Sequence, residues 1–318
     1  MDGFRRLPPY ALGCLRLGRN CNDLAMIDVT HFTDPGCPWA YSAWPVHTTL
    51  KWRYGEQLRW TLVMIGLTED PAQYAARGYT PTRSAIGYQR FRRFGMPFQI
   101  TPKARLSATS PACRAVVATR LAAPPLEEIA LRALQFAQFT TTGTLDDPDT
   151  LRSALAEVEG LDGDAVTGRI DDPEVVASYE ADRARARAAA GSPTEFQGRA
   201  ADTDGAVRYT APSLVFDGPD GRRLEAGGFQ PLEAYDVVIA NLDPSLERRS
   251  PADDPVEVLR AFPFALTTAE VAAVMTEHLG TPNLAAVEAA LIAATGEGRA
   301  DRRPAGDGSL WASVPRPQ

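Results

Sequence analysis

The chain has 318 residues, of which 44% are hydrophobic and 23% charged, and its formal net charge is −7 with a pI near 5.2. This composition is typical of a globular protein of about two domains, and it excludes a disordered chain, a fibre and a disulfide-stapled small protein. The acidic balance argues against nucleic acid as a general partner, and the apolar runs are too short for a membrane-spanning helix.

The first 25 residues combine several arginines with Pro8 and Pro9, which interrupt any apolar segment long enough for a secretory signal. We interpret residues 1–25 as a disordered extension, or as the result of a start codon assigned too early, with Met26 as the functional beginning. Cys14 and Cys21 are then incidental. The small number of cysteines gives no disulfide framework, and we expect a cytoplasmic protein.

A β–α–β unit is predicted between Met26 and Ile65. Residues 26–33 are rich in β-formers and predict a strand, and Asp34-Pro35-Gly36 predicts a turn. Cys37 then opens a helix that runs to about Tyr54, with Pro38 at the first helical position, where its missing N–H is not needed. Residues 58–65 predict the second strand.

The pattern is helical from residue 70 to residue 195, which indicates a large helical insertion. Asp147-Pro148 and Asp172-Pro173 are typical of helix starts, with the aspartate as N-cap. Strand signals then resume.

Residues 212–216 and 222–225 predict a hairpin, and residues 231–241 predict a closing helix. The hairpin turn is expected at residues 217–221.

A separate C-terminal unit is predicted at residues 253–318, after a linker near Pro251. Two short helices, at residues 268–279 and 283–295, precede a hairpin that turns at Gly306–Gly308, which is the outline of a small winged-helix unit. Its second helix carries Glu288 and no Arg or Lys, whereas DNA binding requires basic residues. We therefore expect a packing or dimerisation module and, with it, a homodimer.

Cys37 is the candidate catalytic residue, within the stretch DPGCPWAYSAWP. A cysteine at the start of a helix meets unpaired backbone N–H groups and the positive end of the helix dipole, which lower the pKa of a thiol. The alternative is a buried, unreactive cysteine, which is common for this residue type. The position before a Pro-initiated helix favours the reactive interpretation.

Asp34 and His31, which both precede Cys37 in the chain, are candidate accessory residues. Asp34 could cap the turn or relay protons, and nothing in the sequence decides between these roles. His31 could approach Cys37 or face the core, and strand alternation, which puts it on the same face as Val29, favours the core slightly. The three histidines have no metal-ligand spacing, so we expect no metal site.

Taken together, the first strand, the Cys37-Pro38-Trp39 helix start, the helical insertion and the proline-led strand resemble the DsbA/FrnE branch of the thioredoxin superfamily. The resemblance covers about Met26 to Leu242. It implies an α/β thioredoxin-like domain formed by residues 26–69 and 196–245, with residues 70–195 as insertion. It also implies that Pro212 is cis and abuts the active cysteine, with Ala211 before it as an accessory residue.

The chain departs from this family at one important position. Family oxidoreductases carry a second cysteine three residues after the first, and here that residue is Ala40. A mixed disulfide on Cys37 must therefore be resolved by a small thiol or by another cysteine. The same fold branch is similar to thiol-dependent hydroxychromene-carboxylate isomerases and kappa-class glutathione transferases, which need no resolving cysteine.

Cys113 is the candidate internal resolving residue, because it follows Ser110-Pro111 near a predicted helix start. It also repeats in register with Val116, Val117 and Leu121, which places it on an apolar face. The core interpretation is favoured over the resolving role.

Residues 71–126 contain nine basic residues and no Asp or Glu, whereas the rest of the chain has 24 basic against 40 acidic residues. With the interleaved aromatic residues, this segment could line a site for an anionic substrate; Arg90, Arg92, Arg93 and Tyr88 are the candidate binding residues. The alternative is a solvated face that pairs with acidic helices, and the sequence does not decide between them.

The sequence thus predicts a thiol-dependent oxidoreductase that acts through a single cysteine. Cys37, Pro38, Trp39 and Pro212 form its site, with no tightly bound cofactor and a low-molecular-weight thiol as cosubstrate. A small-thiol-dependent isomerase or transferase on a hydrophobic anion is the first alternative, and a non-catalytic binding protein the second. Since every residue assigned to chemistry lies between Asp34 and Pro212, we expect removal of the C-terminal unit to leave thiol reactivity largely intact, although it could lower stability or disrupt assembly.

Overall fold

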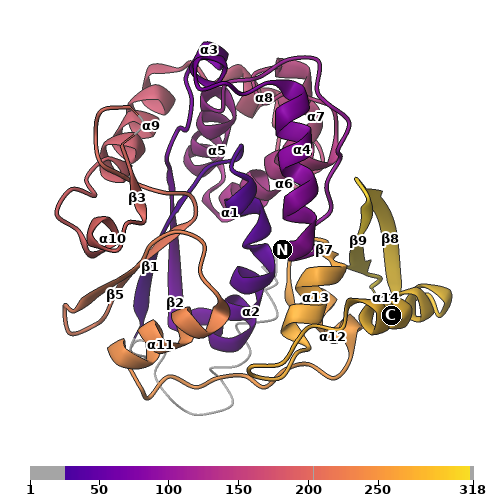
Figure 1. Cartoon of the computed structure of the whole chain (residues 1–318). Coiled ribbons are helices and arrows are strands. Elements are labelled where there is room, and N and C mark those ends of the chain that lie inside the picture. Colours follow the sequence, from indigo (N-terminus) through magenta and orange to yellow (C-terminus); the bar gives the residue numbers. More distant parts are fainter. Residues whose placement is uncertain (1–25, 203, 316–318) are drawn as a thin grey trace, which may run out of the picture.

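A computed structural model describes residues 26–202 and 204–315 of the chain. The extension at residues 1–25, with Cys14 and Cys21, lies outside the described residues, so the interpretation given for it stays a prediction. Among the described residues, a mixed sheet is surrounded by helices, with a second, smaller sheet in the C-terminal unit (Figure 1).

The central sheet has four strands in the order β2-β1-β5-β6. β1 (Ile27–Thr33) pairs in parallel with β2 (Leu58–Met64) and antiparallel with β5 (Ser213–Asp217), and β6 (Arg223–Ala226) forms one edge. The predicted β–α–β unit and the hairpin are thereby confirmed. The chain has the thioredoxin-like α/β fold with a helical insertion that the sequence predicted.

The helix predicted from Cys37 to Tyr54 is divided in two. α1 (Pro38–Ser42) and α2 (Trp44–Tyr54) are separated by Ala43, whose backbone keeps a helical conformation. The physical reason is Pro45, which has no N–H to donate to the carbonyl of Tyr41. α2 and α11 (Leu232–Leu242) pack on one face of the sheet, around Ile27 and Val29.

The helical insertion contains eight α-helices among the described residues. They are α3 (Pro71–Ala76), α4 (Pro81–Phe91), α5 (Ser110–Ala122), α6 (Glu127–Thr140), α7 (Pro148–Leu155), α8 (Gly163–Gly168), α9 (Pro173–Ala186) and α10 (Pro193–Phe196). Short 3₁₀ turns η3 (Gly55–Gln57), η4 (Arg92–Phe94) and η5 (Pro124–Leu126) join some of the elements. A small ladder of β3 (Ala200–Ala201) and β4 (Arg208–Tyr209) leads back to the central sheet.

Both predicted helix starts are correct, with Asp147 and Asp172 at the N-cap positions, and one of the two side chains makes the capping hydrogen bonds. Asp147 accepts hydrogen bonds from the backbone N–H groups of Asp149 and Thr150 at the start of α7. Asp172 makes no such cap at α9, because its carboxylate accepts from Arg169 instead. An arginine three residues away thus competes successfully for the same carboxylate.

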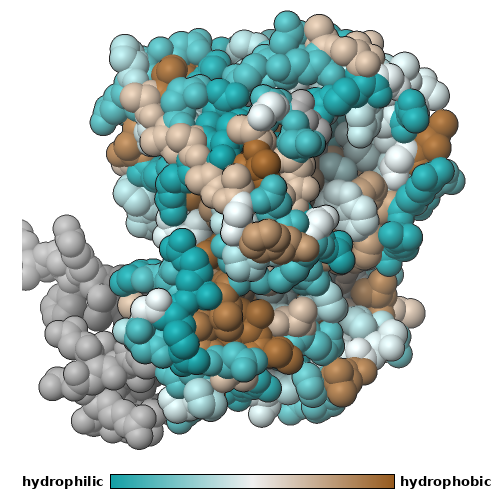
Figure 2. Space-filling model, turned by 60° about the vertical axis from the view of Figure 1, so that its left-hand side comes forward, coloured by the Kyte–Doolittle hydropathy of each residue, from teal (hydrophilic) through white to brown (hydrophobic). Residues whose placement is uncertain are grey.

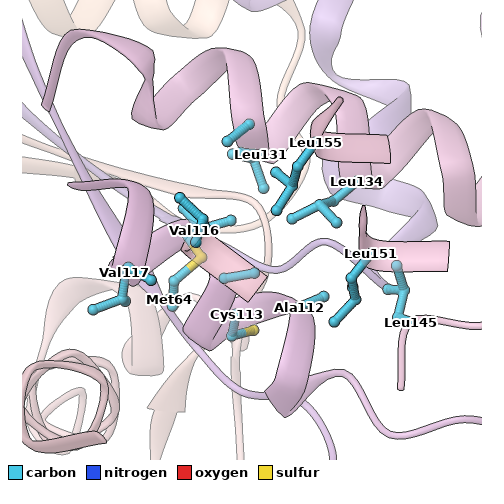
Figure 3. Packing of buried hydrophobic residues seen from close by; sticks show 14 of the residues in the cluster. Met64, Ala112, Cys113, Val116, Val117, Leu131, Leu134, Leu145, Leu151 and Leu155 are labelled. Atoms are coloured by element: carbon cyan, nitrogen blue, oxygen red, sulfur yellow. The ribbon is translucent and has the colours of Figure 1, made fainter. Parts of the chain in front are cut away.

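The insertion packs directly on the sheet. Figure 3 shows Met64 of β2 against Val116 and Val117 of α5, with leucines of α6 and α7 beyond them. This cluster also contains Cys113, whose side chain is fully buried.

Up to residue 315, where the described part of the chain ends, the C-terminal unit has three helices and a three-stranded sheet. Its elements are α12 (Pro255–Ala261), β7 (Leu266–Thr267), α13 (Thr268–Val274), α14 (Leu284–Gly296), β8 (Ala300–Ala305) and β9 (Gly308–Ser313). α12 and β7 were not predicted, and α13 ends at Val274, well before the expected Leu279. The sheet order is β7-β9-β8. The description of this unit as winged-helix-like stays a prediction.

The C-terminal unit shares buried contacts with the rest of the protein. α13 packs against α2, and Trp52 of α2 belongs to the same hydrophobic cluster as Val256, Leu266 and Trp311. The Trp52 indole also donates to the carbonyl of Ser250 (2.8 Å). The unit is therefore part of the support of α2, and its dispensability for thiol reactivity stays a prediction.

The surface is mainly hydrophilic on the face shown in Figure 2, where a hydrophobic patch lies in the lower half of the view. None of the helices among the described residues is long and apolar enough to cross a membrane.

Candidate functional site

Cys37 lies at the junction between β1 and α1. The turn Asp34–Gly36 brings the chain round, and the Cys37 N–H donates to the carbonyl of Asp34 (3.1 Å). Cys37 is the N-cap of α1 with extended backbone, and its own carbonyl accepts from the N–H of Tyr41 (3.0 Å). The predicted position at a helix start is thus correct.

The thiol of Cys37 faces the loop that enters β5. Its Sγ donates a hydrogen bond to the carbonyl of Ala211 (3.1 Å), a residue 174 positions away in the chain. The Ala211–Pro212 peptide bond is cis, as the resemblance implied for Pro212. Only 6% of the Cys37 side chain is exposed, so this loop covers the sulfur.

The environment raises the pKa of the Cys37 thiol to about 12. Burial is the largest cause, and the charge of Asp34 adds to it; the backbone N–H groups of Ala40 and Trp39 and the charge of Arg208 act in the opposite direction. The sequence predicted a lowered pKa from the helix start alone. The N–H groups have the predicted effect, but loss of solvation outweighs them in this conformation.

Asp34, the first residue of the turn that leads to Cys37, is a fully buried carboxyl group. One oxygen accepts from the N–H of Gly36 (2.7 Å), so the residue does cap the turn. The other oxygen accepts from the N–H of Leu67 (2.8 Å), the hydroxyl of Thr109 (3.0 Å) and the thiol of Cys113 (3.4 Å). Burial raises its pKa although these donors lower it. A proton relay through Asp34 stays a prediction.

Cys113 lies in α5, in the hydrophobic cluster of Figure 3. Burial and the neighbouring Asp34 raise the pKa of its thiol. Cys37 and Cys113 are both free cysteines. The favoured interpretation of Cys113 as a core residue agrees with its full burial.

His31 faces the core and not Cys37. Its ring lies edge-on to His47 of α2, with 4.7 Å between centroids, and near Trp60 of β2. Burial lowers the pKa of both histidines, that of His47 to about 3. The Nε2 atoms of the two rings have no hydrogen-bond partner among the described residues. His31 therefore does not belong to the thiol site.

The basic segment divides into two groups. Five of its residues are tied down within the fold: Arg92 pairs with Asp307, Arg105 with Asp146, Arg114 with Asp171 and Arg120 with Glu127 and Asp182, and Lys103 donates to the carbonyls of Thr141 and Gly143. Among the described residues, Arg77, Arg83, Arg90 and Arg93 have no carboxylate within ion-pair distance. Pairing with acidic residues elsewhere thus accounts for four of the arginines, and a role of the segment in substrate binding stays a prediction.

Tyr88 and Tyr74 of this segment reach the neighbourhood of the thiol. Burial raises the pKa of Tyr88 to about 12, and the charge of Cys37 acts in the same direction. The Tyr88 hydroxyl accepts from the side-chain amide of Gln138 (3.2 Å). Burial also raises the pKa of Tyr74, and the charges of Asp34 and Cys37 act in the same direction. Tyr88 was a candidate binding residue; Tyr74 was missed, although it is also an aromatic residue of the basic segment.

Trp39 forms part of an aromatic wall, for which the sequence had suggested Phe91 and Phe94 of the basic segment but not Trp39 or Phe229. We use this name for Trp39, Phe91, Phe94 and Phe229. The Trp39 ring lies 4.8 Å from Phe91, 5.7 Å from Phe94 and 5.5 Å from Phe229, measured between centroids. Phe229 follows β6, far along the chain, and no local pattern marks it.

No group of three or more His, Cys, Asp or Glu side chains among the described residues could hold a metal ion. The donors at the site are a thiol, a carboxyl group and backbone amides. This arrangement suits chemistry at sulfur.

Comparison with known proteins agrees with this geometry. Residues 28–211 match the model of the DSBA-like thioredoxin domain family. Among solved structures, a proposed protein disulfide isomerase from Nitrosomonas europaea is 18% identical with a TM-score of 0.51, and the match covers 68% of this chain and 97% of that one. A probable DsbA oxidoreductase from Streptomyces coelicolor is 17% identical with a TM-score of 0.50, covering 71% and 93%. No curated protein matches the chain.

Proposed function

This chain belongs to the family of DSBA-like thioredoxin domains, and on that premise we propose that it is a thiol–disulfide oxidoreductase that acts through one cysteine, Cys37. The observation that carries the proposal is the position of the Cys37 sulfur. It lies at the start of α1 and against the Ala211 carbonyl, with Ala40 where a second cysteine would be needed for an internal disulfide.

The proposed cycle has two exchange steps. The Cys37 thiolate attacks one sulfur of a substrate disulfide, so that a mixed disulfide forms, the substrate S–S bond breaks and a thiolate leaves. A low-molecular-weight thiol then attacks the mixed disulfide as its thiolate, releases Cys37 and leaves as part of a new disulfide. The second step needs this cosubstrate because Ala40 cannot supply a thiol.

The buried thiol is the resting form in this proposal. With a pKa of about 12 it is protonated at neutral pH and bound to the Ala211 carbonyl. A substrate disulfide that displaces this carbonyl leaves the N–H groups of Trp39 and Ala40 to stabilise the thiolate. Reaction therefore depends on opening of the loop before β5.

A transferase or isomerase acting on a hydrophobic anion is the second candidate. The aromatic wall favours it, together with Arg90 and Arg93, which have no carboxylate partner in the described part of the chain, because they offer an apolar surface with positive charge at its border. In that function a bound small thiol would be the nucleophile and Cys37 would position it. Formation of product from the hydrophobic anion without any change in the oxidation state of the small thiol would distinguish this function from that of an oxidoreductase.

A non-catalytic binding protein is the third candidate, and the raised pKa of Cys37 favours it. It predicts that Cys37 does not exchange with any small disulfide at neutral pH. We propose the cytoplasm as the compartment, as the small number of cysteines in the sequence suggested.

We propose that the protein is a homodimer, as the sequence suggested for the C-terminal unit. Leu284 and Ile292 of α14 are exposed large hydrophobic residues that support this proposal. Sedimentation equilibrium of the wild type and of a Leu284→Glu/Ile292→Glu variant tests it, and a monomeric wild type would contradict it.

The main proposal is tested by intact-mass analysis after incubation with disulfides of several small thiols, with the modified residue mapped. We expect one adduct, on Cys37, that a second small thiol removes. Cys37→Ser should give no adduct, and Cys113→Ser should behave as wild type. An adduct that maps to Cys113, or none at all, contradicts the proposal.

A further inference from the structure

The aromatic wall is built from three separate segments and is partly exposed, since Phe91, Phe94 and Phe229 are half-buried and Trp39 is exposed. Trp39 is 40% exposed, and Phe94 and Phe229 lie 4.8 Å apart between centroids. Trp39 lies in the first turn of α1 and Cys37 is the N-cap of that helix, so the wall begins close to the residue that bears the thiol. Grouped aromatic surface at such a place is typical of a ligand site.

Positive charge borders the wall. The Arg93 guanidinium lies 4.8 Å from the centre of the Phe94 ring, and Arg90 is exposed on the last turn of α4. Neither has an ion pair with a carboxylate among the described residues. Arg92, between them in sequence, is neutralised by Asp307. The wall therefore favours an apolar group that carries a negative charge.

The turn of the β8–β9 hairpin holds the segment that follows the wall. Asp307 accepts a hydrogen bond from the backbone N–H of Phe98 (2.7 Å) with one carboxylate oxygen and pairs with Arg92 through the other. Gly306 lies so close to Phe98 that a Cβ would come within 2.9 Å of its carbonyl carbon. The turn thus rests directly on the backbone at Phe98.

The same segment is held from the side of the thiol. The Tyr41 hydroxyl of α1 donates to the carbonyl of Pro97 (2.9 Å), and the N–H of Gln99 donates to the carbonyl of Phe139 (2.6 Å). Residues 97–99 are therefore held between α1, α6 and the C-terminal hairpin. The Phe91 ring lies 6.2 Å from the Phe98 ring between centroids, so this arrangement supports one side of the wall.

We propose that the aromatic wall binds the aromatic part of an anionic substrate of Cys37, and that Asp307 of the C-terminal unit is the positioning residue that sets this wall. The proposal rests on the proposed function, since it needs a reactive Cys37. It gives the C-terminal unit a role in substrate choice, although Asp307 lies 209 residues from Phe98 in the chain.

The test compares disulfide probes that differ in ring and charge. Dithiobis(nitrobenzoate) is aromatic and anionic, dithiodipyridine aromatic and neutral, and cystamine aliphatic and cationic. In each reaction a bond forms between Cys37 and one probe sulfur, the probe S–S bond breaks, one thiolate leaves, and the Cys37 proton passes to solvent. Each rate is divided by the rate of the same probe with N-acetylcysteine, which removes differences in intrinsic reactivity.

We expect a normalised preference of about tenfold or more for the aromatic anion over cystamine, corresponding to about 1.4 kcal/mol of binding. Asp307→Ala should reduce this preference at least fivefold, because the aromatic anion then binds more weakly and saturates the site at a higher concentration. The rate with cystamine should change less than about twofold. Asp307→Asn, which keeps an acceptor for the Phe98 N–H, should fall between the two. Asp301→Ala, an exposed aspartate of β8, is the matched control and should behave as wild type.

Two results would overturn the proposal. One is an equal loss of reaction rate with every probe in both Asp307 variants, and the other is an unchanged preference for the aromatic anion in both. Binding to Cys37→Ser separates it from the proposed function. We expect calorimetry to give tighter binding of phenylbutyrate than of phenylbutylamine, and Asp307→Ala to abolish this difference. If this difference in binding is found while Cys37 of the wild type reacts with no disulfide, the proposed function is wrong and the proposed binding of an aromatic anion to the wall is retained. If Cys37 reacts with the disulfides without any preference for the aromatic anion, the proposed role of the wall is wrong and the proposed function is retained.

Discussion

Arg132 of α6 and Glu270 of α13 form a buried, two-pronged ion pair that joins the helical insertion to the C-terminal unit. Their side chains are 4% and 0% exposed, and the two N–O distances are 2.7 and 2.6 Å. Glu270 also accepts from the hydroxyl of Thr48 in α2 (2.9 Å) and caps α13 through Thr267. One carboxylate thus connects three parts of the fold.

We expect Glu270→Ala to lower the free energy of unfolding by about 3–5 kcal/mol, because it leaves the Arg132 guanidinium buried without its partner. Chemical denaturation monitored by tryptophan fluorescence measures this. Glu288→Ala, on the exposed face of α14, is the control and should change stability by less than about 0.5 kcal/mol. A similar small loss for Glu270→Ala would show that the pair contributes little.

The rate of Cys37 alkylation should rise with pH well beyond the range of an ordinary cysteine. Its pKa is raised, to about 12, so the thiolate fraction should grow about tenfold for each pH unit between 7 and 10. Iodoacetamide labelling of Cys113→Ser, followed by intact mass, measures it. A rate that levels off below about pH 8 would show that the thiol is acidified in solution, as the helix start alone predicts.

Acid should destabilise the fold through His31 and His47. Their pKa values are lowered in the folded state, so their contribution to stability is present above the unfolded value of about 6.5 and is lost as the pH falls towards about 3 for His47. We expect His47→Gln to flatten the dependence of unfolding free energy on pH between 6 and 4 by up to about 1.4 kcal/mol per pH unit.

The control for that experiment is His278→Gln, since half of the His278 side chain is exposed. Its stability should follow the wild-type pH dependence. A His47→Gln variant with the wild-type slope would mean that the buried pair does not stay neutral.

Ala40→Cys should create an internal Cys-x-x-Cys pair and, with it, dithiol–disulfide cycling in an insulin-reduction assay. The wild type should be weak in this assay unless a small thiol is supplied, because it has no thiol at position 40 to resolve the mixed disulfide. Ala40→Ser is the control of similar size. Strong wild-type activity that survives Cys113→Ser would contradict the single-cysteine proposal.

Local sequence patterns were sufficient to determine the order of the elements around the thiol. A β-rich run, a turn, and a proline at the first helical position place Cys37 between β1 and α1, and each signal depends on neighbours within a few residues. Ala40 is equally a property of the sequence alone. The family resemblance added the cis bond before Pro212.

Only the tertiary structure decided the state of the thiol and what surrounds it. The helix start predicted a lowered pKa for Cys37, yet the loop at Ala211 buries the sulfur, and burial is the sum of contacts from segments distant in sequence. The aromatic wall likewise needs Phe229, and its support needs Asp307. Such contacts depend on how the chain closes on itself, which no local pattern of residues can encode.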